Sequence, residues 1–296
     1  MHFTGMTYRP PFEARSLLLQ VTVGCSHNQC SFCTMYRDVP FQTAPIEQVE
    51  EDLAEAAPYA DRLTRVFLEN GDPFALSADR LTQIAELIHK YLPKVETIAM
   101  YASVKNITGK TDEELKSLRA LGINELNIGI ESGLDEALLL MNKGYTTDQA
   151  RHELLRLKDA GIYWGANVIF GAVGTGRGQV NAEATAALLN QTKPYLIFTG
   201  TIHANPGCPL YDSMKAGTFT ECTFGEYLDE EERFLSLLDP EECYYFGMHP
   251  SNVVRMHGWL DRDKEAMLDQ IRKTLTSLQS HLDARPVRGG EGAIIG

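Results

Sequence analysis

The chain has 296 residues, with 27 Lys and Arg against 40 Asp and Glu, which gives a formal net charge of −13 at pH 7. A hydrophobic fraction of 44% and a charged fraction of 23% are those of a folded globular protein, so disordered and fibrous classes are excluded. The acidic balance disfavours a large nucleic-acid interface, because phosphate binding needs a surplus of Lys and Arg. We therefore expect that nucleic acid is not a partner.

The sequence carries no sign of a membrane segment or of secretion. No apolar run approaches the roughly 20 residues of a membrane span, and residues 1–15 lack the continuous apolar stretch of a signal peptide. Three of the six cysteines, Cys25, Cys30 and Cys33, lie within nine residues. Because the cytoplasm keeps thiols reduced, we expect a cytoplasmic protein without a membrane partner, whose cysteine cluster binds metal and forms no disulfide.

Buried strands and amphipathic helices alternate along the first two thirds of the chain. Short apolar runs that end at glycine or polar residues predict the strands, and apolar residues at three- and four-residue spacing predict the helices. Six strand-then-helix steps imply parallel strands, so we expect one α/β barrel-like domain over residues 1–215, with an open doubly wound sheet as the alternative. In chain order we expect a strand at 17–23, a helix at 46–53, a strand at 65–68, a helix at 81–88, a strand at 97–101, a helix at 111–121, a strand at 125–130, helices at 135–141 and 148–160, a strand at 163–170, a helix at 180–190 and a strand at 195–199.

The pattern changes after about residue 205. A turn-rich loop at 206–209 precedes an acidic helical segment at 226–238, and apolar residues from Leu268 to Leu282 mark one face of a last helix. We therefore expect residues 216–296 to form a helical C-terminal extension that closes the barrel.

The strongest chemical signal follows the first predicted strand. Cys25, Cys30 and Cys33 form a Cys-x4-Cys-x2-Cys motif on one loop. Three thiolates can bind three irons of a [4Fe–4S] cluster and leave the fourth iron open, as a catalytic site requires. A zinc site is the alternative, but it needs a fourth ligand, and His27 inside the same loop is poorly placed to supply it.

This loop resembles the cluster-binding loop of the radical SAM superfamily, in particular of the branch with Elongator protein 3-like, MiaB-like and coproporphyrinogen oxidase-like enzymes. The usual family spacing is Cys-x3-Cys-x2-Cys, so this chain has one additional residue, while Phe32 keeps the usual aromatic residue before the last cysteine. The resemblance covers about residues 16–215. It implies a partial (β/α)6 TIM-like barrel, in agreement with the strand count.

The resemblance also implies a reaction and its partners. Cys25, Cys30 and Cys33 would bind a [4Fe–4S] cluster, at which S-adenosylmethionine is reductively cleaved to a 5′-deoxyadenosyl radical that acts on the substrate. Such a cluster is oxygen-sensitive and needs a reduced electron donor of the flavodoxin or ferredoxin type. No motif assigns a catalytic residue toward the substrate.

Further motifs resemble the S-adenosylmethionine contacts of the family. The turn at 69–72 ends the second strand, where a carboxylate and backbone carbonyls can accept hydrogen bonds from the methionyl ammonium group. Lys143 matches a basic residue that pairs with the cofactor carboxylate in the family. The residues implied as cofactor contacts are Glu69, Asn70, Gly71, Asp72, Glu131, Ser132, Lys143 and Asn167.

The substrate is not specified by these motifs. The negative charge, and the lack of a recognisable RNA-binding domain after residue 215, favour a small molecule or a peptide. Two other classes stay open, a zinc-stabilised α/β binding protein and an iron–sulfur electron-transfer protein. The three remaining cysteines lack metal-ligand spacing, and we expect them in the core: Cys208, Cys222 and Cys243.

Overall fold

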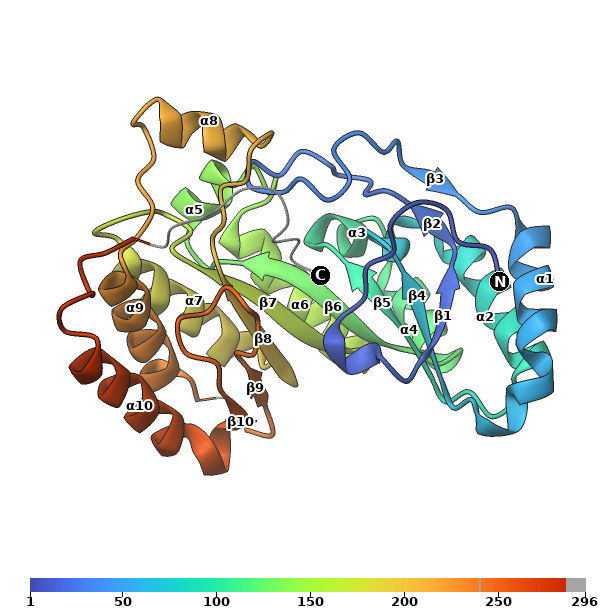
Figure 1. Ribbon diagram of the computed structural model, residues 1–296. Helices are drawn as coiled ribbons and strands as arrows, with labels where there is room; N and C mark the ends of the chain where they lie inside the picture. Colours follow the sequence, from blue (N-terminus) through green and yellow to red (C-terminus); the bar gives the residue numbers. More distant parts are fainter. Residues whose placement is uncertain (240, 286–296) are drawn as a thin grey trace.

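The computed structural model describes residues 1–239 and 241–285, so residues 286–296 of the expected C-terminal extension lie outside the described part. One sheet with the strand order β1-β4-β5-β6-β7-β8-β9-β10 forms its centre (Figure 1). The first six of these strands are parallel neighbours in chain order, which confirms the predicted α/β barrel-like class. They are β1 (Leu17–Gln20), β4 (Arg65–Glu69), β5 (Thr97–Ala102), β6 (Ile123–Glu131), β7 (Tyr163–Phe170) and β8 (Leu196–Thr201).

The C-terminal extension is not wholly helical, because it adds two strands to the sheet. Strand β9 (Tyr244–Phe246) pairs in parallel with β8, and β10 (His257–Trp259) pairs antiparallel with β9. The sheet therefore continues across the predicted boundary at residue 215. The division into residues 1–215 and 216–296 stays a prediction.

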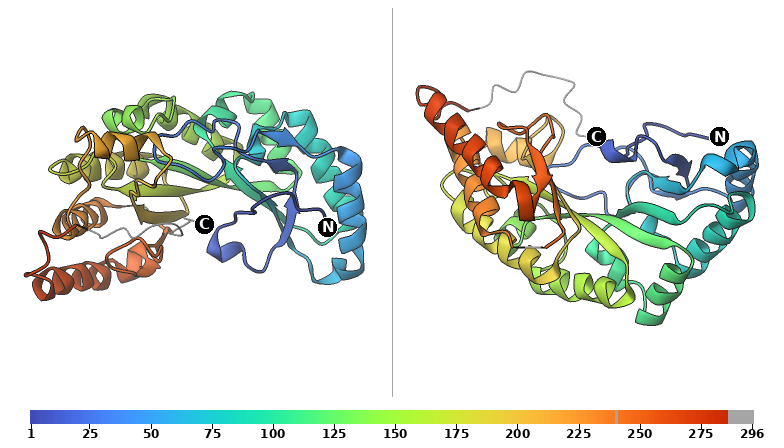
Figure 2. Two further views of the ribbon diagram at one scale, coloured as in Figure 1. Left: turned by 45° about the horizontal axis from the view of Figure 1, so that its top comes forward. Right: turned by 90° about the horizontal axis from the view of Figure 1, so that it is seen from below.

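Helices cover the outer side of the sheet and bury its outward-facing residues. Leu126, Ile128 and Ile130 of β6 are fully buried, as expected of a parallel strand covered by helices. Figure 2 shows the sheet curved like part of a barrel, with the helices on its convex side. The helices are α1 (Ile46–Ala56), α2 (Ala78–Tyr91), α3 (Val104–Thr108), α4 (Asp112–Ala120), α5 (Asp135–Leu140), α6 (Thr147–Ala160), α7 (Gly178–Thr192), α8 (Pro209–Lys215), α9 (Phe224–Leu237) and α10 (Leu260–Ser277).

Local sequence signals set several helix ends. A capping box starts α4, since Thr111 and Glu114 each accept a hydrogen bond from the other's backbone N–H. Ser77 caps α2 by accepting a hydrogen bond from the N–H of Arg80. Gly161 ends α6 with φ of 75°, a conformation that glycine adopts without strain.

The first strand is shorter than the predicted 17–23. It ends at Gln20, and the chain then leaves the sheet as β2 (Thr22–Val23), which pairs antiparallel with β3 (Gln42–Thr43). This small ribbon frames the loop that carries the cysteines. The 3-10 helices of the chain are η1 (Pro11–Glu13), η2 (Ala57–Arg62) and η3 (Pro73–Ala75).

The sheet is open between its two edge strands. Strands β1 and β10 stand at the ends of the strand order, so the barrel is partial. Residues 1–16 lie on the open, concave side of the sheet (Figure 2). In the described part of the chain, no helix has the length and apolar character needed to cross a membrane.

Candidate active site

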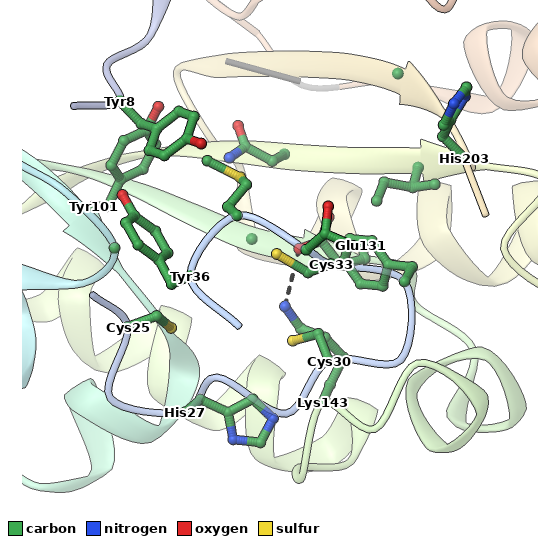
Figure 3. A pocket seen from close by; sticks show the side chains of 18 of the residues that line it. Tyr8, Cys25, His27, Cys30, Cys33, Tyr36, Tyr101, Glu131, Lys143 and His203 are labelled. Atoms are coloured by element: carbon green, nitrogen blue, oxygen red, sulfur yellow. Dashed lines mark hydrogen bonds and ion pairs between the residues drawn. The ribbon is translucent and has the colours of Figure 1, made fainter. Parts of the chain in front are cut away.

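The cysteine loop lines a cavity of about 910 Å³ at the carboxyl ends of the strands. Cys25, Cys30 and Cys33 are all free, partly exposed and part of the cavity wall (Figure 3). The loop makes a left-handed turn at Asn28, where φ is 40°. The amide of Asn28 donates a hydrogen bond of 2.6 Å to the carbonyl of Tyr36, which fixes the turn.

The loop is held against the segment that follows α5. The backbone N–H of Ser31 donates to the carbonyl of Met141 at 3.0 Å, and its hydroxyl donates to that of Leu140 at 2.7 Å. A ring nitrogen of His27 lies 2.6 Å from the carbonyl of Asn142. Three contacts from one short loop fix the positions of the cysteines relative to this segment.

The turn after β4 holds the loop from the other side. The carboxylate of Asp72 accepts hydrogen bonds from both the backbone N–H, at 2.8 Å, and the hydroxyl of Ser26. Burial raises the pKa of Asp72, although these hydrogen bonds act in the opposite direction. A Cβ at Gly71 would lie 2.3 Å from the carbonyl oxygen of Gly24 and 2.8 Å from the Cβ of Cys25, so only glycine allows this close approach.

Glu131 and Lys143 form a buried ion pair beside the cysteines. Their charged atoms are 2.9 Å apart, and the two residues are only 7% and 8% exposed, which excludes a solvent-facing Lys143 (Figure 3). Burial, the largest single effect, would lower the pKa of Lys143, but the charge and hydrogen bond of Glu131, with smaller contributions from Tyr145 and Cys30, together hold this pKa well above its ordinary value. The register shifts between Gly129 and Glu131, and Glu131 has φ of 61°. A bulge of this kind re-aims a side chain at the end of a strand.

The cavity holds a second lysine that the sequence analysis did not single out. Lys105 on α3 lines the same cavity, and its Nζ lies 3.4 Å from Nδ1 of His27. The positive charges of Lys105 and Lys143 both act on Cys30, whose thiol pKa is nevertheless raised, chiefly by burial. Burial likewise raises the pKa of Cys25, to about 11.

The structure brings most, but not all, of the predicted site residues into the cavity wall. Glu69, Asn70 and Ser132 are fully buried and are not part of the lining formed by the described residues. The hydroxyl of Ser132 donates to Asn181 at 2.5 Å, and burial raises the pKa of Glu69 to about 7. The predicted residues that do line the cavity are Cys25, Cys30, Cys33, Gly71, Asp72, Glu131, Lys143 and Asn167.

The glycine-rich stretch after β7 packs against the C-terminal extension and not along the cavity. A Cβ at Gly171 would lie 2.5 Å from the ring of Tyr227, and one at Gly174 would lie 2.7 Å from the carbonyl of Thr220. The glycines therefore permit contact with the extension. The remaining cysteines are fully buried in the core, as expected: Cys208, Cys222 and Cys243.

The N-terminal part of the cavity wall was not predicted from the sequence. Tyr8, Pro10, Pro11 and Phe12 precede the first strand and line the cavity. The only sequence signal was a run of aromatic and proline residues in a segment without a strand or helix pattern. Its position over the open side of the barrel depends on contacts that are distant in the sequence.

The donor set fits an iron–sulfur cluster. Three thiols of one loop line the cavity, and a cluster takes each cysteine on a different iron, so the thiols need not meet at one point. Among residues 1–239 and 241–285, no group of three or more His, Cys, Asp or Glu side chains is arranged around a single metal ion. Gly71 lets the turn after β4 approach Cys25 closely, and the buried Glu131–Lys143 pair gives the cysteines charged neighbours in the same cavity.

Sequence comparison gives a match to one family. The model of the Radical SAM superfamily matches residues 19–187. Among curated proteins, the tRNA-2-methylthio-N(6)-dimethylallyladenosine synthase of Idiomarina loihiensis is 24% identical over 211 residues, which cover 69% of this chain and 43% of that protein. The heme chaperone HemW of Bacillus subtilis is 20% identical over 65% of this chain and 52% of its own length. The chain spans about half the length of these relatives.

Solved structures share the fold. Coproporphyrinogen III oxidase (HemN) from Escherichia coli, a radical SAM enzyme, superposes with a TM-score of 0.52 at 14% identity, over 90% of this chain and 52% of that chain. The radical S-adenosylmethionine methyltransferase TsrM from Kitasatospora setae, solved with cobalamin and a [4Fe–4S] cluster, gives a TM-score of 0.53 at 17% identity, over 66% and 36%. At such low identity these similarities concern the fold alone.

Proposed function

The chain belongs to the radical SAM superfamily, and we propose that it is an enzyme that cleaves S-adenosylmethionine reductively and acts on a small molecule or a peptide. One observation carries this proposal. A single cavity brings together the three cysteines of the loop, the Asp72 turn and the buried Glu131–Lys143 pair.

The cysteines are the proposed cluster ligands. Cys25, Cys30 and Cys33 would each bind one iron of a [4Fe–4S] cluster and leave the fourth iron open to S-adenosylmethionine. When bound, these two cofactors supply a 5′-deoxyadenosyl radical that removes a hydrogen atom from the substrate. The protein contributes the position and the shielding of the site, since the loop is held by Asp72 on one side and by the segment after α5 on the other.

The cofactor's charged groups have matching partners in the cavity wall. We assign the methionyl ammonium group to the turn that contains Gly71 and Asp72, because carboxylate and carbonyl oxygens accept its hydrogen bonds. Glu131, Lys143 and Asn167 line the same cavity and are proposed to contact the rest of S-adenosylmethionine. The side chains behind this wall are proposed to position it without touching the cofactor: Glu69, Asn70 and Ser132.

The partners and the compartment follow from the same chemistry. An open cluster needs an electron from a reduced donor, for which we propose a flavodoxin or ferredoxin. We propose the cytoplasm as the site of action, because all six cysteines are free and reduced thiols persist there. The negative charge of the chain supports a small molecule or a peptide over nucleic acid as substrate.

Anaerobic reconstitution with iron and sulfide tests the proposal. The protein is then incubated with S-adenosylmethionine and dithionite, and we expect methionine and 5′-deoxyadenosine as products. The Cys33→Ala variant is expected to yield neither, because two thiolates do not hold a cluster securely. A chain that binds zinc and no iron would instead be a zinc-stabilised binding protein. A stable reduced cluster without these products would make it an electron-transfer protein.

A further inference from the structure

The N-terminal segment, residues 1–16, is a fixed part of the cavity. The backbone N–H of Thr4 donates to the side chain of Gln20 on β1 at 2.7 Å. Further along, the buried carboxylate of Glu13 pairs with the guanidinium of Arg65 on β4, with contacts of 2.5 and 2.9 Å. The segment is thus anchored near both of its ends, and the residues between these anchors are held over the open side of the barrel (Figure 2).

Phe12 of this segment reaches the far edge of the sheet. Its ring meets that of Phe246 on β9 edge-to-face, with centroids 6.2 Å apart. Phe246 stacks on Phe198 of β8 at 5.7 Å, and Phe198 meets the ring of His249 edge-to-face at 5.9 Å. Phe12, Phe198 and His249 all line the cavity, so the ring contacts that bridge the gap between β1 and β9 also form part of its wall.

Three tyrosines form another part of the wall. Tyr8 of the N-terminal segment meets Tyr36 edge-to-face at 5.3 Å, and Tyr101 on β5 lies beside them (Figure 3). All three line the cavity together with Asn167 of β7. Burial raises the pKa of each tyrosine, so their hydroxyl groups are uncharged at neutral pH and can donate hydrogen bonds.

We propose that the aromatic wall, defined as Tyr8, Phe12, Tyr101 and Phe198, is the substrate-binding part of the cavity and takes a planar, uncharged ring. The inference rests on the proposed function and specifies the class of its substrate. Aromatic side chains favour another ring by stacking and edge-to-face contact beyond the area that they bury. The anchors hold these side chains in place before a ligand binds. Little conformational entropy is therefore lost on binding.

The distribution of charge over the cavity supports an uncharged ligand at this wall. Of the Asp, Glu and Lys residues in the lining formed by the described residues, Asp72, Glu131, Lys105 and Lys143 lie at the cysteine loop or at the turns and the helix that hold it, where the cofactor is proposed to bind, and Glu221 lies in the C-terminal extension. The aromatic wall offers rings and hydroxyl groups instead. Burial also lowers the pKa of His249, which keeps its imidazole neutral beside Phe198.

The cavity is large for a site that takes one small molecule. Its volume of about 910 Å³ lies near the upper end of the 300–1,000 Å³ that single small-molecule sites span. A substrate bound at the aromatic wall would share this cavity with the proposed cofactor site. Hydrogen-atom transfer requires such an arrangement, because the reacting atoms must meet without water between them.

Binding of defined probes to the reconstituted protein of 296 residues tests the inference. With S-adenosylmethionine present and reductant left out, no turnover occurs, and anaerobic titration calorimetry measures binding of 2-naphthol, cyclohexanol and pyrophosphate. We expect 2-naphthol to bind and cyclohexanol to bind at least about tenfold more weakly, because it lacks a ring face. We expect no binding of pyrophosphate.

Two variants of the same segment locate the site. Phe12→Leu keeps an apolar side chain against Phe246 and removes the ring, so 2-naphthol should bind roughly two- to tenfold more weakly. The matched control is Phe3→Leu, because Phe3 is 49% exposed on the same segment and is not part of the cavity lining. It should bind 2-naphthol as the unaltered protein does. Iron content confirms that both variants are intact.

Several outcomes would overturn the inference. They are equal binding of 2-naphthol and cyclohexanol, binding of pyrophosphate in their place, no binding of 2-naphthol, or equal weakening by the Phe12 and Phe3 substitutions. Formation of 5′-deoxyadenosine by the same preparation, measured separately with dithionite, would leave the proposed function standing in each case. If no 5′-deoxyadenosine forms, the proposed function is rejected, whether or not the probes bind.

Discussion

Replacement of Lys143 by methionine tests what the buried ion pair with Glu131 contributes to stability and to cofactor binding. The substitution keeps an unbranched side chain and removes the charge that pairs with Glu131 at 2.9 Å. Because Glu131 is only 7% exposed, its carboxylate would stay buried without a partner. Breaking such a pair from one side costs about 3–5 kcal/mol of folding free energy. Lys143→Met should therefore destabilise the apo-protein by about this amount.

The double variant Lys143→Met/Glu131→Gln should recover most of that loss, because no buried charge remains. In the reconstituted protein, loss of one charge-assisted contact should weaken S-adenosylmethionine binding by about ten- to a hundredfold. Denaturant unfolding and equilibrium binding measure the two effects. Lys90→Met is the control, since Lys90 pairs with Glu50 at 2.7 Å on the surface, where water screens the charges, and its replacement should leave the stability almost unchanged. Lys143→Met with unchanged stability and unchanged cofactor affinity would refute this reasoning.

Three further predictions concern the loop anchor, a buried acid and the core cysteines. Asp72→Ala removes the acceptor of the Ser26 N–H, so the cysteine loop should loosen and iron should be lost to a chelator about tenfold faster. Burial raises the pKa of Glu231 to about 8, so the folded state binds more protons than the unfolded chain between pH 4.5 and 8, and stability should fall as pH rises through this window. Glu231→Gln should remove about 1.4 kcal/mol per pH unit of that fall, measured by denaturant unfolding across the pH range. A variant in which alanine replaces Cys208, Cys222 and Cys243 should keep the iron content of the unaltered protein, measured after reconstitution.

Each of these predictions has a clear contrary result. Asp72→Asn keeps one acceptor oxygen and serves as the control for Asp72→Ala, and equal iron loss from both variants and the unaltered protein would mean that Asp72 does not anchor the loop. A pH profile of stability that Glu231→Gln leaves unchanged would show that this carboxyl group is already ionised in the folded protein. A fall from about eight irons to about four in the cysteine variant would reveal an auxiliary cluster.

Much of the sheet could be predicted because buried parallel strands leave a strong pattern. Strand β7 was expected at residues 163–170 and has these bounds, since its run of apolar and small residues is covered by helices on one side. Strands β9 and β10 were not predicted. Each has three residues, which is too few for a periodic pattern. Strand β9 forms by pairing with β8, which is distant in the sequence, and β10 forms by pairing with β9.

The site was partly predictable for a similar reason. The cysteine spacing is local, so three sequence positions were enough to predict the loop. The burial of Lys143 was not predictable, because it depends on the bulge that turns Glu131 toward it. The contribution of Tyr8 and Phe12 was missed, because their segment has no helix or strand pattern and is positioned by tertiary contacts such as that between Phe12 and Phe246.

The electron paramagnetic resonance spectrum of the dithionite-reduced protein, recorded with and without S-adenosylmethionine, shows whether the chain holds a cluster to which this cofactor binds. We expect the signal of a reduced [4Fe–4S] cluster, held by Cys25, Cys30 and Cys33, that changes shape when S-adenosylmethionine is added, because the cofactor would bind the open iron. A cluster signal that S-adenosylmethionine leaves unchanged, or a reconstituted protein without any cluster signal, would contradict this expectation.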